Sequence, residues 1–329
     1  MLTDPFGRQI TYLRISVTDR CNFRCVYCMP PKGVPHVPHE QIMRYEEIAS
    51  FVQVAARQGI RKVRITGGEP LVRADLPRLV EMISGIEEIE DISLTTNGIL
   101  LEKYAGALAQ AGLKRVNISL DTLNPEKFAR ISRGGDLNKV LRGIEAAETH
   151  GLTPIKINSV IMRGINDDEL VDLAKLTLNH PWNLRFIELM PIENQQPWGE
   201  GFPPPEDIFM PVSEVMDLLR PLGLHPVELP GDSGPALPYR LDDGIGTVGF
   251  ISPLTEQHFC QRCNRMRLTA DGNLRPCLMS NIEIPVLPAL RTGQPILPLL
   301  EEAVMRKPIS HQLANQITPN GRCMIQIGG

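Results

Sequence analysis

The chain repeats one local pattern six times: an apolar segment rich in β-branched residues, a turn with Gly or Asn, and an amphipathic segment. Strands that alternate with helices fold into a parallel sheet with helical crossovers. The expected strands span residues 10–17, 62–66, 91–95, 115–120, 154–161 and 184–190, and the expected helices span 46–58, 76–83, 102–111, 137–149, 167–178 and 213–219. Six such units form an open sheet or an incomplete barrel, and both bind ligands at the carboxyl ends of their strands.

The sequence changes character after residue 191. Segments 193–211 and 225–238 are rich in Pro and Gly, which is typical of loops and linkers. From about residue 240 the strand and helix patterns no longer alternate, so we expect a smaller, irregular domain laid against the first. This predicts a mobile N-terminal tail over residues 1–9, a first domain over 10–224 and a C-terminal domain over 225–329.

Charge and composition exclude several classes of protein. The 329 residues carry 34 Lys and Arg against 38 Asp and Glu, a net charge of −4, whereas proteins that coat nucleic acid are normally basic. The chain has no run of eighteen apolar residues that could cross a membrane, and its N-terminus lacks the basic and apolar regions of a signal peptide. We therefore expect a cytoplasmic protein without a membrane or nucleic-acid partner.

Six of the seven cysteines form two closely spaced groups. The first follows the first expected strand with the spacing C-x3-C-x2-C, and the second has the spacing C-x2-C-x13-C. Their members are Cys21, Cys25 and Cys28 in the first group, and Cys260, Cys263 and Cys277 in the second. In a cytosolic protein such groups indicate metal or redox chemistry rather than disulfides. The seventh, Cys323, is expected to be a packed thiol.

Each cysteine group supplies three thiolates, which leaves the kind of metal centre open. A structural zinc site needs four ligands, and the nearby His36, His39 and His258 could complete one. A four-iron cluster held by three thiolates keeps one iron open for a substrate or cofactor. The first group favours such a 4Fe–4S cluster, whereas zinc and iron–sulfur both fit the spacing of the second.

Four basic residues fall within apolar strands, where a charge is costly unless it meets a partner. These residues are Arg14, Arg64, Lys156 and Arg185. Their occurrence on four different strands predicts a shared cavity, and arginine forks suit an anion such as a triphosphate. Arg265 and Arg267 fall on one face if their segment is extended, while Arg262, between two cysteines, is a weaker candidate.

Residues 14–30, R-I-S-V-T-D-R-C-N-F-R-C-V-Y-C-M-P, resemble the signature motif of radical S-adenosylmethionine enzymes. Gly67-Gly68-Glu69-Pro70 is similar to the second motif of that superfamily. The second cysteine group, residues 263–274 (C-N-R-M-R-L-T-A-D-G-N-L) and the final Gly328-Gly329 resemble the GTP 3′,8-cyclase family of molybdenum-cofactor biosynthesis. This resemblance extends over residues 5–329.

The resemblance implies an incomplete (β/α)6 TIM-like barrel whose mouth is closed by a smaller C-terminal domain. It implies two 4Fe–4S clusters, which resolves the second group in favour of iron–sulfur: the first cluster binds S-adenosylmethionine and the second binds the purine. Reductive cleavage gives a 5′-deoxyadenosyl radical that removes the 3′ hydrogen of GTP. The ribose radical then attacks carbon 8 of guanine, giving (8S)-3′,8-cyclo-7,8-dihydroguanosine 5′-triphosphate, a lyase reaction.

The resemblance also implies roles for individual residues. The residues expected at S-adenosylmethionine are Tyr27, Gly68, Ser119 and Met190. Those expected at GTP are Arg14, Arg64, Thr95, Lys156, Arg185, Arg265, Met266 and Arg267. Gly328 and Gly329 are expected to enter the active site, and Glu69 is expected to orient its neighbours rather than to transfer protons.

The expected partners are GTP, an external one-electron donor and the next enzyme of the molybdopterin pathway, and the expected state is a monomer or a homodimer. Two rival functions remain at this stage. One is a peptide-modifying radical S-adenosylmethionine enzyme with additional clusters. The other is a non-enzymatic metal-binding or redox-sensing regulator.

Overall fold

The computed structural model describes residues 1–192, 198–229, 234–313, 318–319 and 321–328. The described residues form one twelve-stranded sheet in the order β12-β11-β10-β1-β2-β3-β4-β5-β6-β9-β8-β7. Its central strands are β1 (Tyr12–Ser16), β2 (Lys62–Thr66), β3 (Asp91–Thr96), β4 (Arg115–Ser119), β5 (Lys156–Ile161) and β6 (Asn183–Glu188). These six strands are parallel neighbours, as the alternation predicts.

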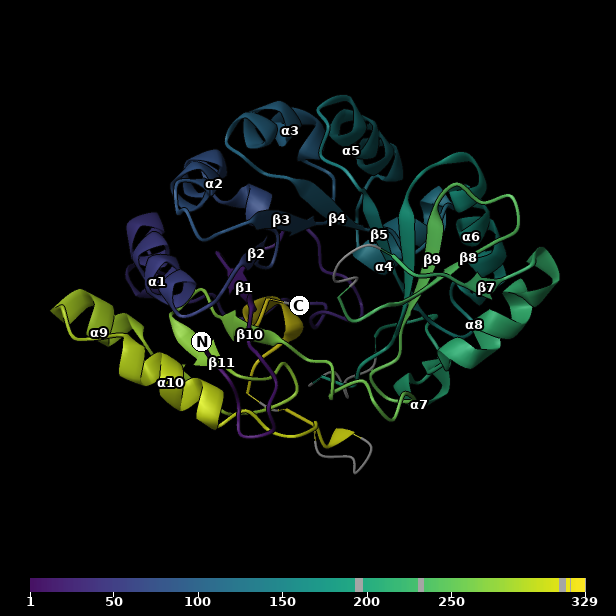
Figure 1. Ribbon diagram of the computed structural model, residues 1–329. Helices are drawn as coiled ribbons and strands as arrows, with labels where there is room; N and C mark the ends of the chain where they lie inside the picture. Colours follow the sequence, from purple (N-terminus) through teal and green to yellow (C-terminus); the bar gives the residue numbers. More distant parts are fainter. Residues whose placement is uncertain (193–197, 230–233, 314–317, 320, 329) are drawn as a thin grey trace.

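The helices of the β–α units lie on the outer side of the curved sheet (Figure 1). They are α1 (Tyr45–Arg57), α2 (Leu76–Ser84), α3 (Leu101–Gln110), α5 (Leu137–Thr149), α6 (Leu170–Asn179) and α8 (Val212–Leu219). The predicted helices agree within a few residues, except that residues 167–169 form a separate 3-10 turn before α6. A further helix, α4 (Pro125–Ser132), contributes residues to the internal pocket and begins where Asn124 accepts hydrogen bonds from the backbone N–H groups of Glu126 and Lys127.

The C-terminal part extends both edges of this sheet, so it is not separate from it. Its strands are β7 (His225–Pro226), β8 (Leu237–Arg240), β9 (Thr247–Ile251), β10 (Arg265–Leu268), β11 (Asn273–Arg275) and β12 (Ile284–Pro285). Strand β10 pairs in parallel with β1, and β9 pairs in parallel with β6. The described residues thus form a partial barrel in which the C-terminal segment supplies two further parallel strands.

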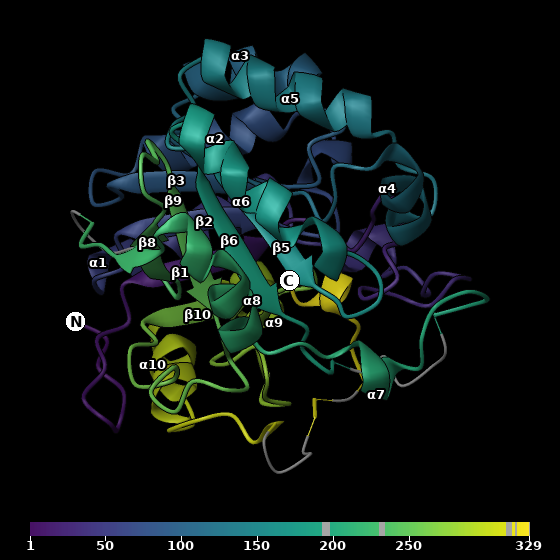
Figure 2. The same cartoon turned by 90° about the vertical axis from the view of Figure 1, so that its right-hand side faces the viewer.

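Two of the remaining helices lie near the edge of the sheet that β10, β11 and β12 form. Helices α9 (Leu287–Thr292) and α10 (Leu297–Met305) lie on the side of the molecule opposite α3 and α5 (Figures 1 and 2). The short helix α7 (Pro205–Ile208) lies in the connection between β6 and α8. A 3-10 turn at Met324–Gln326 brings the C-terminus inside the curve of the strands (Figure 1).

The first nine residues, expected to form a mobile tail, contact the rest of the protein through a few side chains. The side chain of Leu2 is buried, and Thr3 forms an antiparallel bridge with Gln9. Arg8 pairs with Asp4 and donates hydrogen bonds to Cys260 O at 2.9 Å and Ile309 O at 2.9 Å. These two carbonyls lie 252 and 301 residues away in sequence, which local patterns do not reveal.

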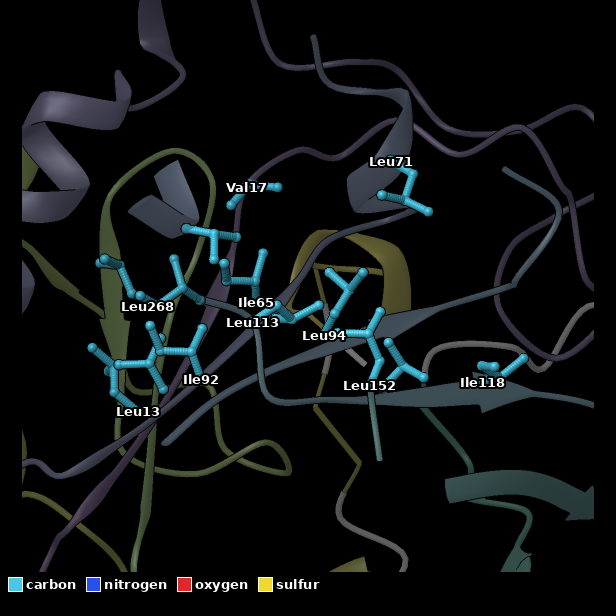
Figure 3. Packing of buried hydrophobic residues seen from close by; sticks show 14 of the residues in the cluster. Leu13, Val17, Ile65, Leu71, Ile92, Leu94, Leu113, Ile118, Leu152 and Leu268 are labelled. Carbon is cyan, nitrogen blue, oxygen red and sulfur yellow. The ribbon is translucent and has the colours of Figure 1, made fainter. Parts of the chain in front are cut away.

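The main core lies between the strands and the outer helices. Leu13, Ile65 and Leu94 are fully buried and point toward this layer (Figure 3). Because side chains alternate along a strand, the residues next to them face the inside of the barrel. This alternation sends Arg14 and Arg64 inward, which positions charge where the ligand site lies.

Candidate active site

A single pocket inside the partial barrel joins both cysteine groups. It is lined by strand residues, by the loop after β1 and by the C-terminal segment. All six grouped cysteines line it, namely Cys21, Cys25, Cys28, Cys260, Cys263 and Cys277. Two groups separated by more than two hundred residues in sequence therefore face one space.

The first group occupies the loop between β1 and α1. The backbone N–H of Phe23 donates to Cys21 Sγ at 3.4 Å, which is one of the contacts that orient this thiol. Burial raises the pKa of Cys21 to about 11. Burial also raises the pKa of Cys25 and Cys28, and the neighbouring thiols and Asp121 add to the rise because they oppose a further negative charge. Such thiols ionise readily only with a cation beside them, as in a metal cluster.

The second group is flanked by cations. Although burial opposes it, Arg265 and Lys307 lower the pKa of Cys263 to about 6. Burial raises the pKa of Cys260 and Cys277, and Lys307 acts against this rise in both. Thiols with adjacent positive charge suit an anionic thiolate cluster.

The three histidines that could have completed a zinc site do not line the pocket with the cysteines. His36 lies 3.6 Å from a carboxylate oxygen of Asp19, and neither it, His39 nor His258 lines the pocket. His311 does line it, and its Nε2 lies 2.7 Å from Pro253 O. Among the described residues no three His, Cys, Asp or Glu side chains close around one metal ion. Three thiols on each side of the pocket are the number that a four-iron cluster with one open iron requires.

All four residues expected at S-adenosylmethionine line this pocket: Tyr27, Gly68, Ser119 and Met190. The hydroxyl of Tyr27 donates to Asp121 Oδ2 at 2.7 Å, and Val160 N donates to the other carboxylate oxygen at 2.9 Å. Burial raises the pKa of Asp121 to about 6, an effect that these two hydrogen bonds oppose. Asp121 is thus a positioning group for Tyr27 that the sequence analysis missed.

The Gly67-Gly68-Glu69 turn follows β2 and packs tightly against the cysteine loop. A Cβ at Gly68 would lie 2.3 Å from Arg20 O, so glycine is required there by the protein's own backbone. Glu69 accepts hydrogen bonds from Leu71 N at 3.0 Å, Thr96 Oγ1 at 2.7 Å and Asn97 N at 2.7 Å. Burial raises its pKa to about 7. These contacts fit the expected orienting role of Glu69.

Five arginines line the pocket and carry most of its charge: Arg14, Arg64, Arg185, Arg265 and Arg267. The strand register places Arg14 between Arg267 on β10 and Arg64 on β2. Burial lowers the pKa of all three, that of Arg267 to about 9, and their mutual repulsion lowers the pKa of Arg14 further. A row of buried like charges is stabilised by an anion that binds across it.

Two residues expected at GTP lie outside the pocket lining. Met266 faces the hydrophobic core, because strand alternation sends it opposite to Arg265 and Arg267. Lys156 is buried at the start of β5, on the same face of the strand as Asn158 two residues later. Asn158 does line the pocket. Burial lowers the pKa of Lys156 to about 6, and Arg185, Arg115 and Arg64 add to the effect.

Polar atoms without protein partners face the same space. Thr95 Oγ1, an expected GTP contact, and Asn158 Oδ1 are buried and have no hydrogen-bond partner among the described residues. Both residues line the pocket. Buried polar atoms are normally hydrogen-bonded, so these two indicate a polar ligand. Asn158 was missed by the sequence analysis, although its place two residues after Lys156 on the same expected strand indicates the same inward face.

The C-terminal tail enters the barrel. Arg267 Nη1 donates to Gly328 O at 2.5 Å, and Met324 and Ile325 line the pocket. Gly328 has φ +69°, and a Cβ on it would lie 2.5 Å from Thr66 Oγ1. The expected entry of the tail is therefore seen for Gly328, whereas Gly329 lies outside the described residues.

Glu188 is a second carboxylate that the sequence analysis missed. It is fully buried at the end of β6 and accepts hydrogen bonds from Val212 N at 3.2 Å and Leu254 N at 3.1 Å. It thereby ties β6 to the C-terminal segment beside the pocket. Arg262, the weaker candidate, instead forms a surface pair with Glu256 and does not line the pocket.

Fold and site together define a radical S-adenosylmethionine enzyme with a second cysteine group beside the first. The Radical SAM superfamily model matches residues 15–177, and a model described as Molybdenum Cofactor Synthesis C matches residues 182–313. The GTP 3′,8-cyclases of Pelotomaculum thermopropionicum and Alkaliphilus oremlandii are 51% and 48% identical to the chain, and each match covers 100% of both sequences. The chain belongs to the GTP 3′,8-cyclase family.

Solved structures share the fold at low identity. SuiB of Streptococcus suis bound to S-adenosylmethionine has a TM-score of 0.60 at 13% identity, covering 88% of this chain and 66% of that one. The protein anSMEcpe with bound AdoMet has a TM-score of 0.56 at 16% identity, covering 93% and 79%. These likenesses confirm the partial-barrel fold. Separately, no helix within the described ranges has the length and apolar character needed to span a bilayer.

Proposed function

We propose that the chain converts GTP to (8S)-3′,8-cyclo-7,8-dihydroguanosine 5′-triphosphate, the first step of molybdenum-cofactor biosynthesis, using two 4Fe–4S clusters and S-adenosylmethionine. The observation that carries the proposal is the one pocket that both cysteine groups and five arginines line. Membership of the GTP 3′,8-cyclase family supports the same reaction. The rival of a peptide-modifying enzyme rests on fold likeness alone, which does not define a substrate.

The first half of the pocket suits S-adenosylmethionine. When bound, a four-iron cluster with an open iron supplies one electron, and S-adenosylmethionine supplies the carbon radical that removes a hydrogen atom from the substrate. Cys21, Cys25 and Cys28 would hold the cluster, and Tyr27, fixed by Asp121, would cover the adenine. Gly68, Ser119 and Met190 line the adjoining strand ends.

The second half of the pocket suits GTP. Arg14, Arg64 and Arg267 would bind the triphosphate across three adjacent strands, with Arg185 and Arg265 beside them. Thr95 Oγ1 and Asn158 Oδ1 are placed to bond polar groups of the nucleoside. Lys156 would lie near GTP as a further polar group rather than as a full charge, because burial and the neighbouring arginines lower its pKa to about 6. A side-chain contact of Met266 with GTP is not supported by its place in the core.

Cys260, Cys263 and Cys277 would hold the second cluster, which would supply a binding site for the purine. The tail would close the pocket, with Gly328 held by Arg267 and Gly329 following it. We further propose that residues 10–224 and 225–329 act as barrel and closing domain, joined by the shared sheet.

We also propose a cytoplasmic location, an external one-electron donor and transfer of the product to the next enzyme of the molybdopterin pathway. None of the seven cysteines forms a disulfide, which suits a reducing compartment. A monomer or a homodimer is expected.

The test uses anaerobically reconstituted protein with dithionite, S-adenosylmethionine and GTP, and identifies the products by mass spectrometry. Roughly eight irons per chain are expected for two four-iron clusters. The proposal requires 5′-deoxyadenosine together with a new isomer of GTP. Cys25→Ala should abolish 5′-deoxyadenosine, and Arg265→Ala should lose the isomer while keeping iron and 5′-deoxyadenosine. Formation of 5′-deoxyadenosine with GTP untouched would show that the substrate is wrong.

A further inference from the structure

Lys307 is a buried cation that neither the pocket lining nor the proposed reaction uses. It follows α10, and its side chain is only 3% exposed. Its ammonium donates hydrogen bonds to Arg265 O at 2.8 Å and Pro276 O at 2.6 Å. Within the described part of the chain no carboxylate pairs with it. A buried ammonium without a carboxylate is costly unless another negative group lies nearby.

The groups nearby that would become negative on binding a cluster are the thiols of the second cysteine group. Lys307 is held against the backbone next to two of these cysteines, Cys263 and Cys277. The two carbonyls that it binds belong to the residue before Cys277 and to the second residue after Cys263. The Lys307 side chain therefore holds the two segments that carry Cys263 and Cys277. Its charge lies outside the pocket lining, whereas Arg265 and Arg267 line the pocket.

We propose that Lys307 is the positioning residue of the second iron–sulfur centre: it holds the two ligand segments together and is the buried counter-charge of the cluster. This inference rests on the proposed function, which supplies the cluster. A positive charge beside a cluster favours the state with one more electron, so Lys307 raises the reduction potential of the second centre. The same charge keeps three thiolates compatible with burial.

The test uses the full-length chain with Cys21, Cys25 and Cys28 all replaced by Ala, so that only the second centre contributes to the spectra. The measurements are iron per chain and the midpoint potential followed by electron paramagnetic resonance. Lys307→Gln keeps N–H donors but removes the charge. It should shift the reduction equilibrium at least tenfold toward the oxidised state, which for one electron is about 59 mV.

The matched control is Arg306→Gln, which removes a charge from the neighbouring, half-exposed residue that pairs with Glu302 on the surface. Its potential should equal that of the parent. An unchanged potential in Lys307→Gln would overturn the inference. If Lys307→Gln fails to hold iron, Lys307→Arg decides: recovered iron supports a role of the charge, and equal loss overturns it. A parent chain without roughly four irons would instead refute the proposed second cluster.

Discussion

The hydrogen bond of 2.7 Å between the Tyr27 hydroxyl and Asp121 joins the first cysteine loop to the end of β4. Both carboxylate oxygens of Asp121 accept a hydrogen bond, since the other oxygen accepts from Val160 N. The bond fixes the ring of Tyr27 over the pocket rather than leaving it to rotate. A residue that was expected only from its place in the motif thus owes its orientation to a carboxylate ninety-four positions away.

Tyr27→Phe should keep the ring and lose this orientation. A hydrogen bond to a charged group contributes about 1.5–3 kcal/mol, so we expect the Kd for S-adenosylmethionine to rise about tenfold. Equilibrium binding to the reconstituted enzyme measures it, and the iron content should not change. Tyr104→Phe, on the outer helix α3, is the control. Equal affinity in Tyr27→Phe would show that the hydroxyl does not position the ring.

The buried Lys156 lowers the folding stability of the protein by an amount that depends on pH. Burial lowers its pKa to about 6, so between pH 6 and 10 the unfolded chain binds more protons at this residue than the folded chain does. Folding stability due to this group therefore rises with pH across that window. Lys156→Met removes the cost and should raise the melting temperature more at pH 7 than at pH 9.5.

Differential scanning fluorimetry of both proteins at the two pH values tests this expectation. Lys139→Met, on the exposed face of α5, should produce the same small change at each pH. A Lys156→Met effect that is equal at both pH values would contradict the lowered pKa.

At the scale of elements, the C-terminal tail is tied to the turns around β11. Arg322 binds Asp271 Oδ2 at 2.8 Å and Glu283 Oε1 at 2.7 Å, and Glu283 also pairs with the buried Arg275. Although burial opposes it, Arg322 lowers the pKa of Asp271. The stability from this pair is therefore present above the ordinary pKa of an aspartate and is lost as pH falls through the lowered value.

These ion pairs lie just before the turn that carries Gly328 into the barrel. Arg322→Gln should release the tail, and we expect kcat/KM for GTP to fall at least tenfold while iron content and 5′-deoxyadenosine formation persist. Hydrogen exchange of residues 321–328 should increase in parallel. Arg142→Gln breaks an exposed pair between α5 and α3 and should change neither quantity. Full GTP turnover with a released tail would contradict the role of the tail in closing the site.

At the scale of the whole molecule, charge is distributed unevenly. The chain has a net charge of −4, yet five arginines line its pocket. The carboxylates among the lining residues, Asp121 and Glu188, already accept hydrogen bonds from the protein. The pocket therefore attracts anions although the protein as a whole repels them.

This distribution predicts a difference between the two ligands. GTP carries several negative charges, whereas S-adenosylmethionine carries a sulfonium, so screening by salt should weaken only GTP binding strongly. Raising the ionic strength from about 0.05 to 0.5 M should increase KM for GTP several-fold and leave KM for S-adenosylmethionine nearly constant. Initial rates at fixed pH measure both constants. Equal responses of the two constants would refute the assignment of the arginines to GTP.

Local patterns in the sequence were sufficient to predict the six β–α units, to find both cysteine groups and to indicate the arginines that face inward. Strand and helix periodicities are properties of neighbouring residues, so Arg14 between apolar neighbours already signals an inward charge. The family motifs added the expected ligands. Most of the predicted boundaries agree with the structure because they rest on this short-range information.

The tertiary structure alone decided which distant segments meet. The parallel pairing of β10 with β1 places Arg267 beside Arg14, and no local pattern specifies that neighbour. The same holds for Lys307 behind the second cysteine group and Arg322 at the base of the tail. It holds as well for the contacts of Arg8 with the C-terminal segment. Pairings of this kind depend on chain topology and burial, which a single sequence encodes only through the whole fold.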